Sequence, residues 1–168
     1  MNIITKFTLS SQPGMDALLL LTKALAIEKF APLVDKKTLA HYIDQHFNAQ
    51  VLTAETNSMS NQWLIVYVDD TPAGYARVTS KGKRPAVLEG KRAMRIADFG
   101  VLQAYPQPAV RDALFEKCLT VCQLYENIWI NEYAGHPLLS FFESKGFVRQ
   151  PEVFQLDELA LASTCLIR

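Results

Sequence analysis

Apolar and polar positions along the chain follow two different periods, and each period predicts a different kind of element. Residues 2–9 alternate loosely, which favours a short opening strand. Residues 15–30 are apolar on more than one side, so we expect a long and well-buried helix there. Ser11 and Pro13 precede this segment as a cap and an early proline, and Pro32 ends it.

Two further helices are predicted before the first long strand. From Asp35 onward, apolar and aromatic side chains recur at helical spacing, among them Leu39, Ile43 and Phe47. A shorter helical segment covers residues 50–59. The first third of the chain is therefore predicted to be mainly helical.

The middle of the chain predicts consecutive antiparallel strands. Residues 62–68 form a continuous apolar run, typical of a central strand, and residues 73–80 return as its hairpin partner. Residues 81–92 are rich in lysine, arginine, glycine and proline, and we interpret them as a solvated hairpin tip rather than a ligand patch. Residues 93–102 form the next strand.

The rest of the chain alternates helices and strands. After a loop, a helix carries one apolar stripe, made of Val110, Leu114, Cys118, Val121 and Tyr125. Residues 127–133 indicate a buried strand, residues 136–147 a short helix, and residues 147–157 and 160–168 two final strands. The whole pattern predicts a mixed α/β domain in which helices separate the strands of one largely antiparallel sheet.

The composition supports a single domain over residues 1–168. This length is enough for one hydrophobic core, and 49% of the residues are apolar. Seventeen Lys and Arg residues balance 17 Asp and Glu residues, so the charge gives no reason to expect a nucleic-acid partner. The apolar run at residues 17–21 is far too short to span a bilayer, and no signal-peptide pattern surrounds it. We therefore expect a cytoplasmic protein with no membrane partner.

The cysteines and histidines suggest neither a disulfide framework nor a metal site. The chain has three cysteines, an odd number. Cys118 and Cys122 share one face of a predicted helix, and we interpret them as small buried residues rather than a redox or metal pair. His41, His46 and His136 are widely separated, so no metal is expected.

Three segments, in the order in which they follow one another along the chain, indicate a protein family. They are "WLIVYVDDTPAGYARV" at 63–78, the strand, loop and helix at 96–118, and "NIWINEYAGHPLLSFFESKGF" at 127–147. Together they resemble the GNAT superfamily of N-acetyltransferases, in particular bacterial enzymes of the spermine/spermidine acetyltransferase type. The resemblance extends over nearly the whole chain, and its most specific part is the last segment, with Trp129 and "FFESKGF".

The resemblance implies an α+β fold and a co-substrate. The fold is a single GNAT-like domain with a central, mostly antiparallel twisted sheet, a parallel splayed strand pair and helices on both faces. Acetyl-CoA lies between the splayed strands, and a primary amine of a small molecule or a protein accepts the acetyl group. The residues implied to contact the cofactor lie on the strand before the loop and at the start of the next helix: Phe99, Gly100, Val101, Gln107, Ala109, Val110, Arg111 and Asp112.

The loop departs from the phosphate-binding pattern of the family, Q/R-x-x-G-x-G/A, which falls here on residues 106–111. Pro106, Ala109 and Arg111 replace the polar residue, the first glycine and the second small residue, so the loop is a degenerate form of the pattern. Two prolines in it lack backbone N–H donors. Arg111 leaves two alternatives open: its guanidinium binds the pyrophosphate, or its bulk fills the phosphate's place, paired with Asp112.

The expected acid–base residues are also altered. Phe142 stands where the family often places a tyrosine as general acid, and Ala97 where it often has a glutamate. Asp98 is adjacent, but strand alternation points it to the opposite face. The catalytic candidates are His136, as a base that titrates near neutral pH, and Tyr133. The alternative is that Tyr133 is an ordinary strand aromatic and His136 a turn residue.

Two main functional hypotheses follow. The first is an acetyl-CoA-dependent N-acetyltransferase that acts on a primary amine. The second is a catalytically impaired GNAT-fold protein, a pseudoenzyme that binds a ligand or a protein partner. An acyl-CoA other than acetyl-CoA is a further alternative, and an exposed edge strand near the C terminus is a plausible surface for homodimerisation.

Overall fold

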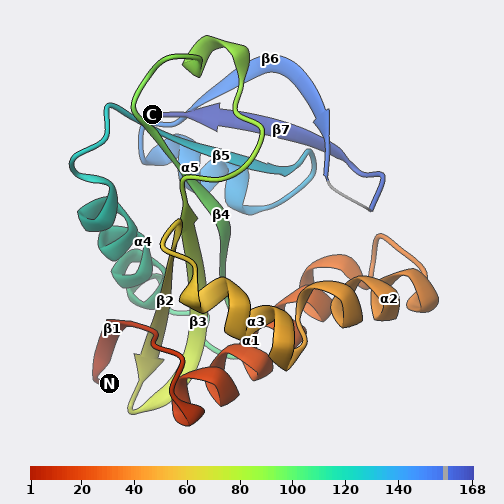
Figure 1. Cartoon of the computed structure of the whole chain (residues 1–168), viewed down its shortest axis with the longest axis vertical. Helices are drawn as coiled ribbons and strands as arrows, with labels where there is room; N and C mark the ends of the chain where they lie inside the picture. Colours follow the sequence, from red (N-terminus) through yellow and green to blue (C-terminus); the bar gives the residue numbers. More distant parts are fainter. Residues whose placement is uncertain (157–158) are drawn as a thin grey trace.

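The described part of the chain forms one mixed sheet of seven strands, ordered β1-β2-β3-β4-β5-β7-β6 (Figure 1). The computed structural model describes residues 1–156 and 159–168. Its strands are β1 (Ile3–Phe7), β2 (Asn61–Val68), β3 (Thr71–Thr79), β4 (Ala93–Val101), β5 (Asn127–Tyr133), β6 (Val148–Gln155) and β7 (Ala162–Ile167). Its helices are α1 (Gln12–Phe30), α2 (Lys36–His46), α3 (Ala49–Asn57), α4 (Pro108–Cys122) and α5 (Leu138–Ser144), with a 3-10 turn at Ala86–Leu88. This architecture confirms the expected fold class.

The elements lie where the sequence predicts them, with ends shifted by a few residues. Side-chain oxygens of Ser11, Asp35 and Asn48 accept hydrogen bonds of 2.8–3.3 Å from backbone N–H groups in the first turns of α1, α2 and α3. Gly146, with φ +91°, reverses the chain after α5. The strand expected at 147–157 extends to Asp157, which lies outside the described residues.

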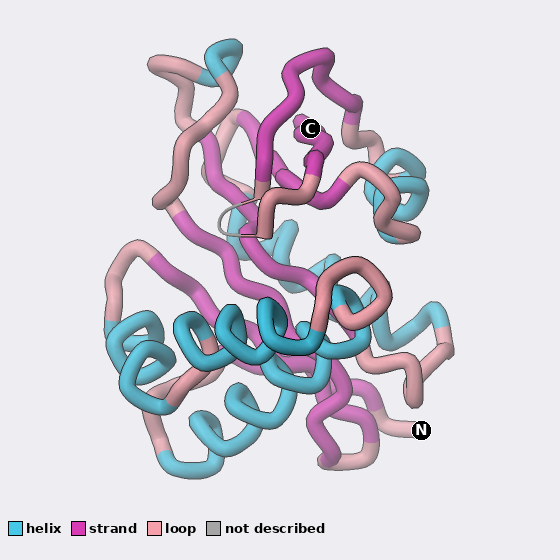
Figure 2. The backbone as a smooth tube through the Cα atoms, turned by 90° about the vertical axis from the view of Figure 1, so that its right-hand side faces the viewer, coloured by secondary structure: helices cyan, strands magenta, loops and turns pink. Residues whose placement is uncertain are grey.

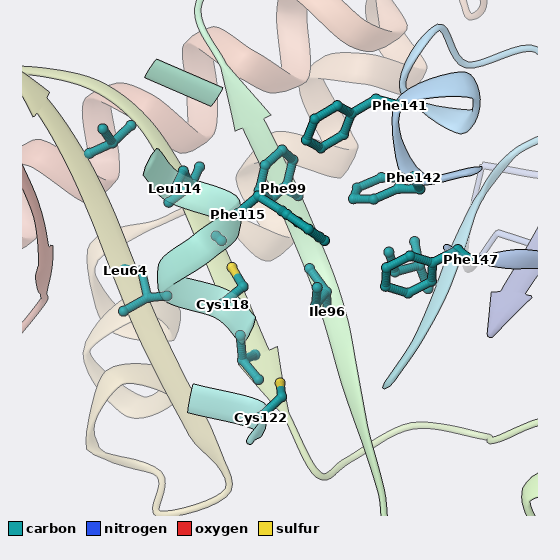
Figure 3. Close-up of a cluster of buried hydrophobic side chains, with 14 of the residues drawn as sticks. Leu64, Ile96, Phe99, Leu114, Phe115, Cys118, Cys122, Phe141, Phe142 and Phe147 are labelled. Carbon is teal, nitrogen blue, oxygen red and sulfur yellow. The ribbon is translucent and has the colours of Figure 1, made fainter. Parts of the chain in front are cut away.

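One face of the sheet is covered by α4 and α5, and this interface is rich in phenylalanine (Figure 3). The ring cluster consists of Phe99, Phe115, Phe141, Phe142 and Phe147. Neighbouring ring centroids in it are 5.3–6.3 Å apart. Cys118 and Cys122 are buried along the same side of α4, and burial raises the pKa of Cys122 to about 11. These thiols therefore stay protonated at neutral pH and act as small core residues.

The opposite face is covered by α1, α2 and α3, which lie in front of the strands in Figure 2. Leu18 and Leu21 of α1 and Leu52 of α3 are fully buried against Trp63 and Tyr75 of the sheet. Within residues 1–156 and 159–168, no helix is both long and apolar enough to cross a bilayer. The long helix α1 is buried on one side and exposed on the other, as a surface helix of a layered domain.

The basic segment at 81–92 connects β3 and β4 as the expected hairpin, but it is more than a solvated tip. Leu88 is buried in a small cluster with Ala93, Trp129 and Cys165. The Arg84 guanidinium donates hydrogen bonds to the backbone carbonyl groups of residues 88 and 91. The segment is thus anchored at its centre, while its three lysines, Lys81, Lys83 and Lys91, are exposed.

The strands β4 and β5 form the parallel pair, and they pair over a short distance. The register matches Ala93 with Asn127, and the last matched residues are Arg95 and Trp129. Beyond this point β4 continues beside β3 and β5 continues beside β7. In Figure 1, β1–β4 run along the long axis of the molecule, whereas β6 and β7 lie across it. The two parts of the sheet therefore separate between β4 and β5.

Replacing Phe115 by alanine should lower the free energy of unfolding by about 3–5 kcal/mol, because the ring is fully buried and its removal leaves a cavity. Leu20→Ala, on the exposed side of α1, is the control and should change this free energy by less than about 0.5 kcal/mol. Urea unfolding followed by circular dichroism measures both. Similar losses in the two variants would contradict the burial of Phe115 in the ring cluster.

Candidate functional site

A cavity of about 680 Å³ opens where β4 and β5 separate. Its walls come from the carboxyl halves of both strands, the end of α1, the aromatic side of α2 and the loop before α4. Beyond Arg95, the edge of β4 that faces β5 has no partner strand among the described residues, so residues 97–101 line the cavity. Ligands of open sheets bind at this kind of position, outside the carboxyl ends of parallel strands.

A β-bulge in β4 places two consecutive residues at the cavity. Arg77 of β3 pairs with Asp98, whereas the next residue, Val78, pairs with Ile96. Ala97 is therefore an extra residue, and both Ala97 and Asp98 line the cavity. The expectation that Asp98 points to the opposite face is wrong, because the bulge shifts the alternation of side chains by one residue.

Asp98 belongs to a charged network on this side of the sheet. Its Oδ2 accepts a hydrogen bond from Arg77 Nε at 3.0 Å, and Glu55 Oε2 lies 3.4 Å from Arg77 Nη1. The guanidinium also lies over the ring of Trp63, 5.5 Å from its centroid. Burial, and then the charge of Asp98, raise the pKa of Tyr75 well above its usual value. Two carboxylates thus share one guanidinium beside a tyrosine that stays protonated.

Arg111 lines the cavity from the start of α4. Its guanidinium carbon is 4.1 Å from the centroid of the Phe141 ring, and its Nε is buried without a hydrogen bond in the described part of the chain. Asp112, expected as its partner, instead forms an ion pair with Lys145, with 3.1 Å between Oδ1 and Nζ. The pairing of Arg111 with Asp112 is therefore wrong. The aromatic face of Phe141, and not a carboxylate, lies against the Arg111 charge.

The predicted cofactor residues fall into separate groups. Those that line the cavity are Phe99, Gly100, Val101, Gln107 and Arg111. Ala109 is exposed in the first turn of α4, and Val110 is fully buried in the core. The Val110 N–H donates to the carbonyl of Gln107 at 3.1 Å. The backbone amides of Gln107 and Ala109 have no protein acceptor among the described residues.

The structure brings His136 and Tyr133 together after β5. Their ring centroids are 4.8 Å apart, and both residues line the cavity. His136 Nδ1 accepts a hydrogen bond from the backbone N–H of Leu138 at 2.9 Å, and burial lowers the pKa of His136 to about 4. The neutral ring then carries its hydrogen on Nε2. At neutral pH this geometry favours a hydrogen-bond donor over the general base expected from the sequence.

Glu132 fixes the end of β5 against α1. Its side chain is buried, and Oε1 lies 2.6 Å from Lys29 Nζ and accepts the backbone N–H of Tyr133 at 3.0 Å. Lys29 Nζ also lies 5.8 Å from the centroid of the Tyr133 ring. Burial, followed by the charge of Glu132, raises the pKa of Tyr133. Its hydroxyl is therefore protonated at neutral pH and can donate a hydrogen bond.

Phe142 and Asn131 differ in what they bring to the site. Phe142 is buried in the ring cluster and supplies no polar group to the cavity. Asn131, which is not among the residues predicted from the sequence, lines the cavity. A period of two places Trp129, Asn131 and Tyr133 on one face of β5, and this was the available signal. The apolar residues around Asn131 made the whole run look uniformly buried.

No protein-family model matches the sequence, but solved structures share its fold. The PaiA N-acetyltransferase from Thermoplasma acidophilum, in complex with coenzyme A, matches with a TM-score of 0.75 at 12% identity over 98% of each chain. A GCN5-related N-acetyltransferase from Rhodopseudomonas palustris matches with a TM-score of 0.71 at 14% identity, over 100% of this chain and 96% of that one. A GNAT-family acetyltransferase from Streptococcus pneumoniae matches with a TM-score of 0.62 at 10% identity, over 99% and 98%. These likenesses show that the chain has the GNAT fold.

Because the pKa of His136 falls from 6.5 to about 4 on folding, the unfolded chain binds more protons than the folded one between these values. The stability associated with His136 is therefore present above about pH 6.5 and is lost as the pH falls toward 4. His136→Phe should flatten this part of the pH dependence, measured by urea unfolding at several pH values. The exposed His41→Phe is the control and should keep the wild-type slope. An unchanged slope in His136→Phe would show that the fold does not hold the ring neutral.

Proposed function

We propose that the chain is an N-acetyltransferase that transfers the acetyl group of acetyl-CoA to a primary amine of a small molecule or a protein. The observation that carries this proposal is the separation of β4 from β5 after a short parallel pairing, with a cavity of about 680 Å³ between them. This volume is typical of cofactor sites. The N-acetyltransferase from Thermoplasma acidophilum, which shares the fold, is in complex with coenzyme A.

Where the loop before α4 lines the cavity, a side chain more than the backbone is suited to bind the anionic part of CoA. Arg111 offers guanidinium N–H groups from a half-buried position over Phe141. The amides of Gln107 and Ala109 add donors at the positive end of α4. The unpaired edge of β4 at residues 99–101 offers backbone groups to the amide-containing arm. When bound, acetyl-CoA supplies an acyl group activated as a thioester.

On the acceptor side, Asp98 is suited to take the proton that an attacking amine loses. The bulge brings its carboxylate to the cavity beside Ala97, the position at which the family resemblance places a glutamate. Arg77 holds Oδ2 at 3.0 Å and leaves Oδ1 for the amine or an intervening water. Proton removal by a positioned carboxylate is ordinary general-base chemistry.

His136 and Tyr133 are suited to donate hydrogen bonds on the other side of the reaction. The Leu138 N–H holds His136 so that Nε2 carries the hydrogen, and the Tyr133 hydroxyl is protonated at neutral pH. Both residues line the cavity. In this arrangement the Tyr133 hydroxyl protonates the leaving sulfur, and the His136 Nε2–H stabilises it with a hydrogen bond; the family often gives the first role to a tyrosine on the following helix.

The alternative, a GNAT-fold protein without turnover, is favoured by the composition of the loop. Pro106 and Pro108 remove two backbone donors. The Glu28 carboxylate accepts the N–H of Gln103 at 3.1 Å, which places a negative charge beside the expected phosphate position. Binding of CoA is the measurement that separates the two hypotheses.

Acetyl-CoA at about 100 times its dissociation constant should add about 2.7 kcal/mol to the free energy of unfolding and raise the melting temperature by roughly 5–10 °C. Arg111→Ala should weaken this binding by about 10- to 100-fold without a large change in the melting temperature of the free protein, because it removes charge-assisted hydrogen bonds. Arg149→Ala, exposed and outside the cavity, is the control.

Two outcomes would contradict the binding of acetyl-CoA with Arg111 as a phosphate ligand. A melting temperature that acetyl-CoA does not change would support the alternative without turnover. Tighter binding of CoA by Arg111→Gly would show that the arginine occludes the phosphate position instead of binding it.

Asp98→Asn should lower kcat by about 100-fold or more while CoA binding stays close to that of the wild type, because only proton removal is lost. Glu55→Gln is the matched control: it also contacts Arg77 but lies on α3, outside the main cavity, and should keep most of the activity. Steady-state kinetics with a panel of primary amines measures both variants. Equal losses would assign the effect to the charged network around Arg77 rather than to proton transfer.

A further inference from the structure

Lys29, in the last turn of α1, reaches across to the end of β5. Its Nζ lies 2.6 Å from Glu132 Oε1, and that oxygen also accepts the backbone N–H of Tyr133 at 3.0 Å. The same ammonium lies 5.8 Å from the centroid of the Tyr133 ring. Lys29 and Tyr133 both line the main cavity. One ammonium group therefore contacts the charge and the ring at the point where β5 borders the cavity.

The carboxylate of Glu132 is almost completely buried, which is uncommon for a charged side chain. The Glu132 side chain is 7% exposed, against 24% for Lys29. Burial of an ion pair costs desolvation energy, and a well-packed apolar pair often gives equal or greater stability. Stability of the fold alone therefore does not account for this pair. What the pair adds is a fixed positive and a fixed negative charge beside His136.

The charge state of His136 depends on both members of the pair. Its ring packs edge-on against Tyr133, whose hydroxyl is protonated at neutral pH, with 4.8 Å between the centroids. Glu132, on β5, favours the charged imidazolium, and Lys29, on α1, opposes it. From α5, the backbone N–H of Leu138 faces the ring and carries no net charge. Burial is the largest effect, and together with Lys29 it lowers the pKa of His136 to about 4.

The placement of the His136 ring depends on its neutral state. Nδ1 accepts the N–H of Leu138 at 2.9 Å, which is possible only while Nδ1 carries no hydrogen. An imidazolium has a hydrogen on both ring nitrogens and loses this contact, so α5 would no longer direct Nε2. Removal of the Lys29 charge would leave Glu132 without its counter-charge and able to stabilise such an imidazolium.

We propose that Lys29 is a positioning residue: by neutralising Glu132, it keeps His136 in the neutral form that α5 holds with Nε2–H available at the cavity. Lys29 acts through Glu132 and His136, without contact with the reacting atoms. This inference rests on the proposed acetyl transfer, in which the Nε2–H group of His136 stabilises the leaving sulfur. The positive charge of Lys29, more than its packing, is what the reaction requires.

The test is an NMR titration of the free protein, which is simple to read because the chain has three histidines. The Cε1–H resonance of His136 is assigned by its loss in His136→Phe. In the wild type it should titrate at about pH 4. Lys29→Met should raise this midpoint by about one pH unit or more, because the buried carboxylate loses its counter-charge. Lys29→Gln, which can still donate a hydrogen bond to Glu132, takes its place if the methionine variant does not fold.

Three further variants separate charge from packing. Lys29→Arg keeps the positive charge and should restore the wild-type midpoint. Lys29→Met combined with Glu132→Gln removes both charges, and its midpoint should return to within about half a pH unit of the wild type. Lys23→Met, on the exposed side of α1 and outside the cavity, is the matched control and should leave the midpoint unchanged.

The same variants show whether the charge state of His136 matters for turnover. At saturating acetyl-CoA and amine, kcat of Lys29→Met should fall as the pH decreases to the raised midpoint. Its acid limb should therefore lie at a higher pH than that of the wild type, by the same amount as the NMR midpoint. Lys29→Arg should keep the wild-type profile. A purely structural role of Lys29 would instead lower kcat by the same factor at every pH.

Three results would overturn the inference. They are an unchanged His136 midpoint in Lys29→Met, a raised midpoint without a shift in the pH–rate profile, and an equal rise in Lys29→Arg and Lys29→Met. The last would assign the effect to packing and not to charge. Failure of the proposed function has a different signature: Lys29→Met raises the midpoint as expected, but the wild type transfers acetyl to no amine.

Discussion

The gap between β4 and β5 persists because the two strands are anchored to different parts of the molecule. On one side, β4 is held by its ladder to β3 and by the Phe99 ring, which packs among the phenylalanines of α4 and α5. On the other side, β5 is held by β7 and by the ion pair of Glu132 with Lys29 on α1. Closing the gap would break buried contacts on at least one side, and such contacts are costly to lose. The cavity and every group that lines it depend on this division of the sheet.

The elements were predictable because their signals are local, whereas the site depends on contacts between distant segments. Helix caps such as Ser11 and Asp35, and the apolar runs of the strands, can be identified from a few neighbouring residues. The bulge at Ala97 is set by the register of β4 against β3, which no local pattern encodes. The partner of Arg111 is likewise decided by the placement of Phe141 on another helix. Neither the bulge at Ala97 nor the ring contact of Arg111 could be predicted from the neighbouring residues in the sequence.

The polar groups of the site are of two kinds. Most charges in and beside the cavity are paired within the protein, as Lys29 is with Glu132. Arg111 Nε and Asn131 Oδ1 are buried without hydrogen bonds among the described residues, and both residues belong to the wall of the same cavity. Departures from complete internal hydrogen bonding are expected to gather at functional sites.

The loop before α4 differs from a glycine-rich loop in the step at which its conformational entropy is lost. Pro106 and Pro108 restrict its backbone even in the unfolded chain, and hydrogen bonds close a turn at each end, from Tyr105 to Leu102 and from the helix start to Gln107. Its conformational freedom is thus lost during folding and not during binding. A glycine-rich loop would order around a phosphate as it arrives. Here association should proceed in one fast step, and the residence time of a ligand should depend on the arginine side chain and not on opening of the loop.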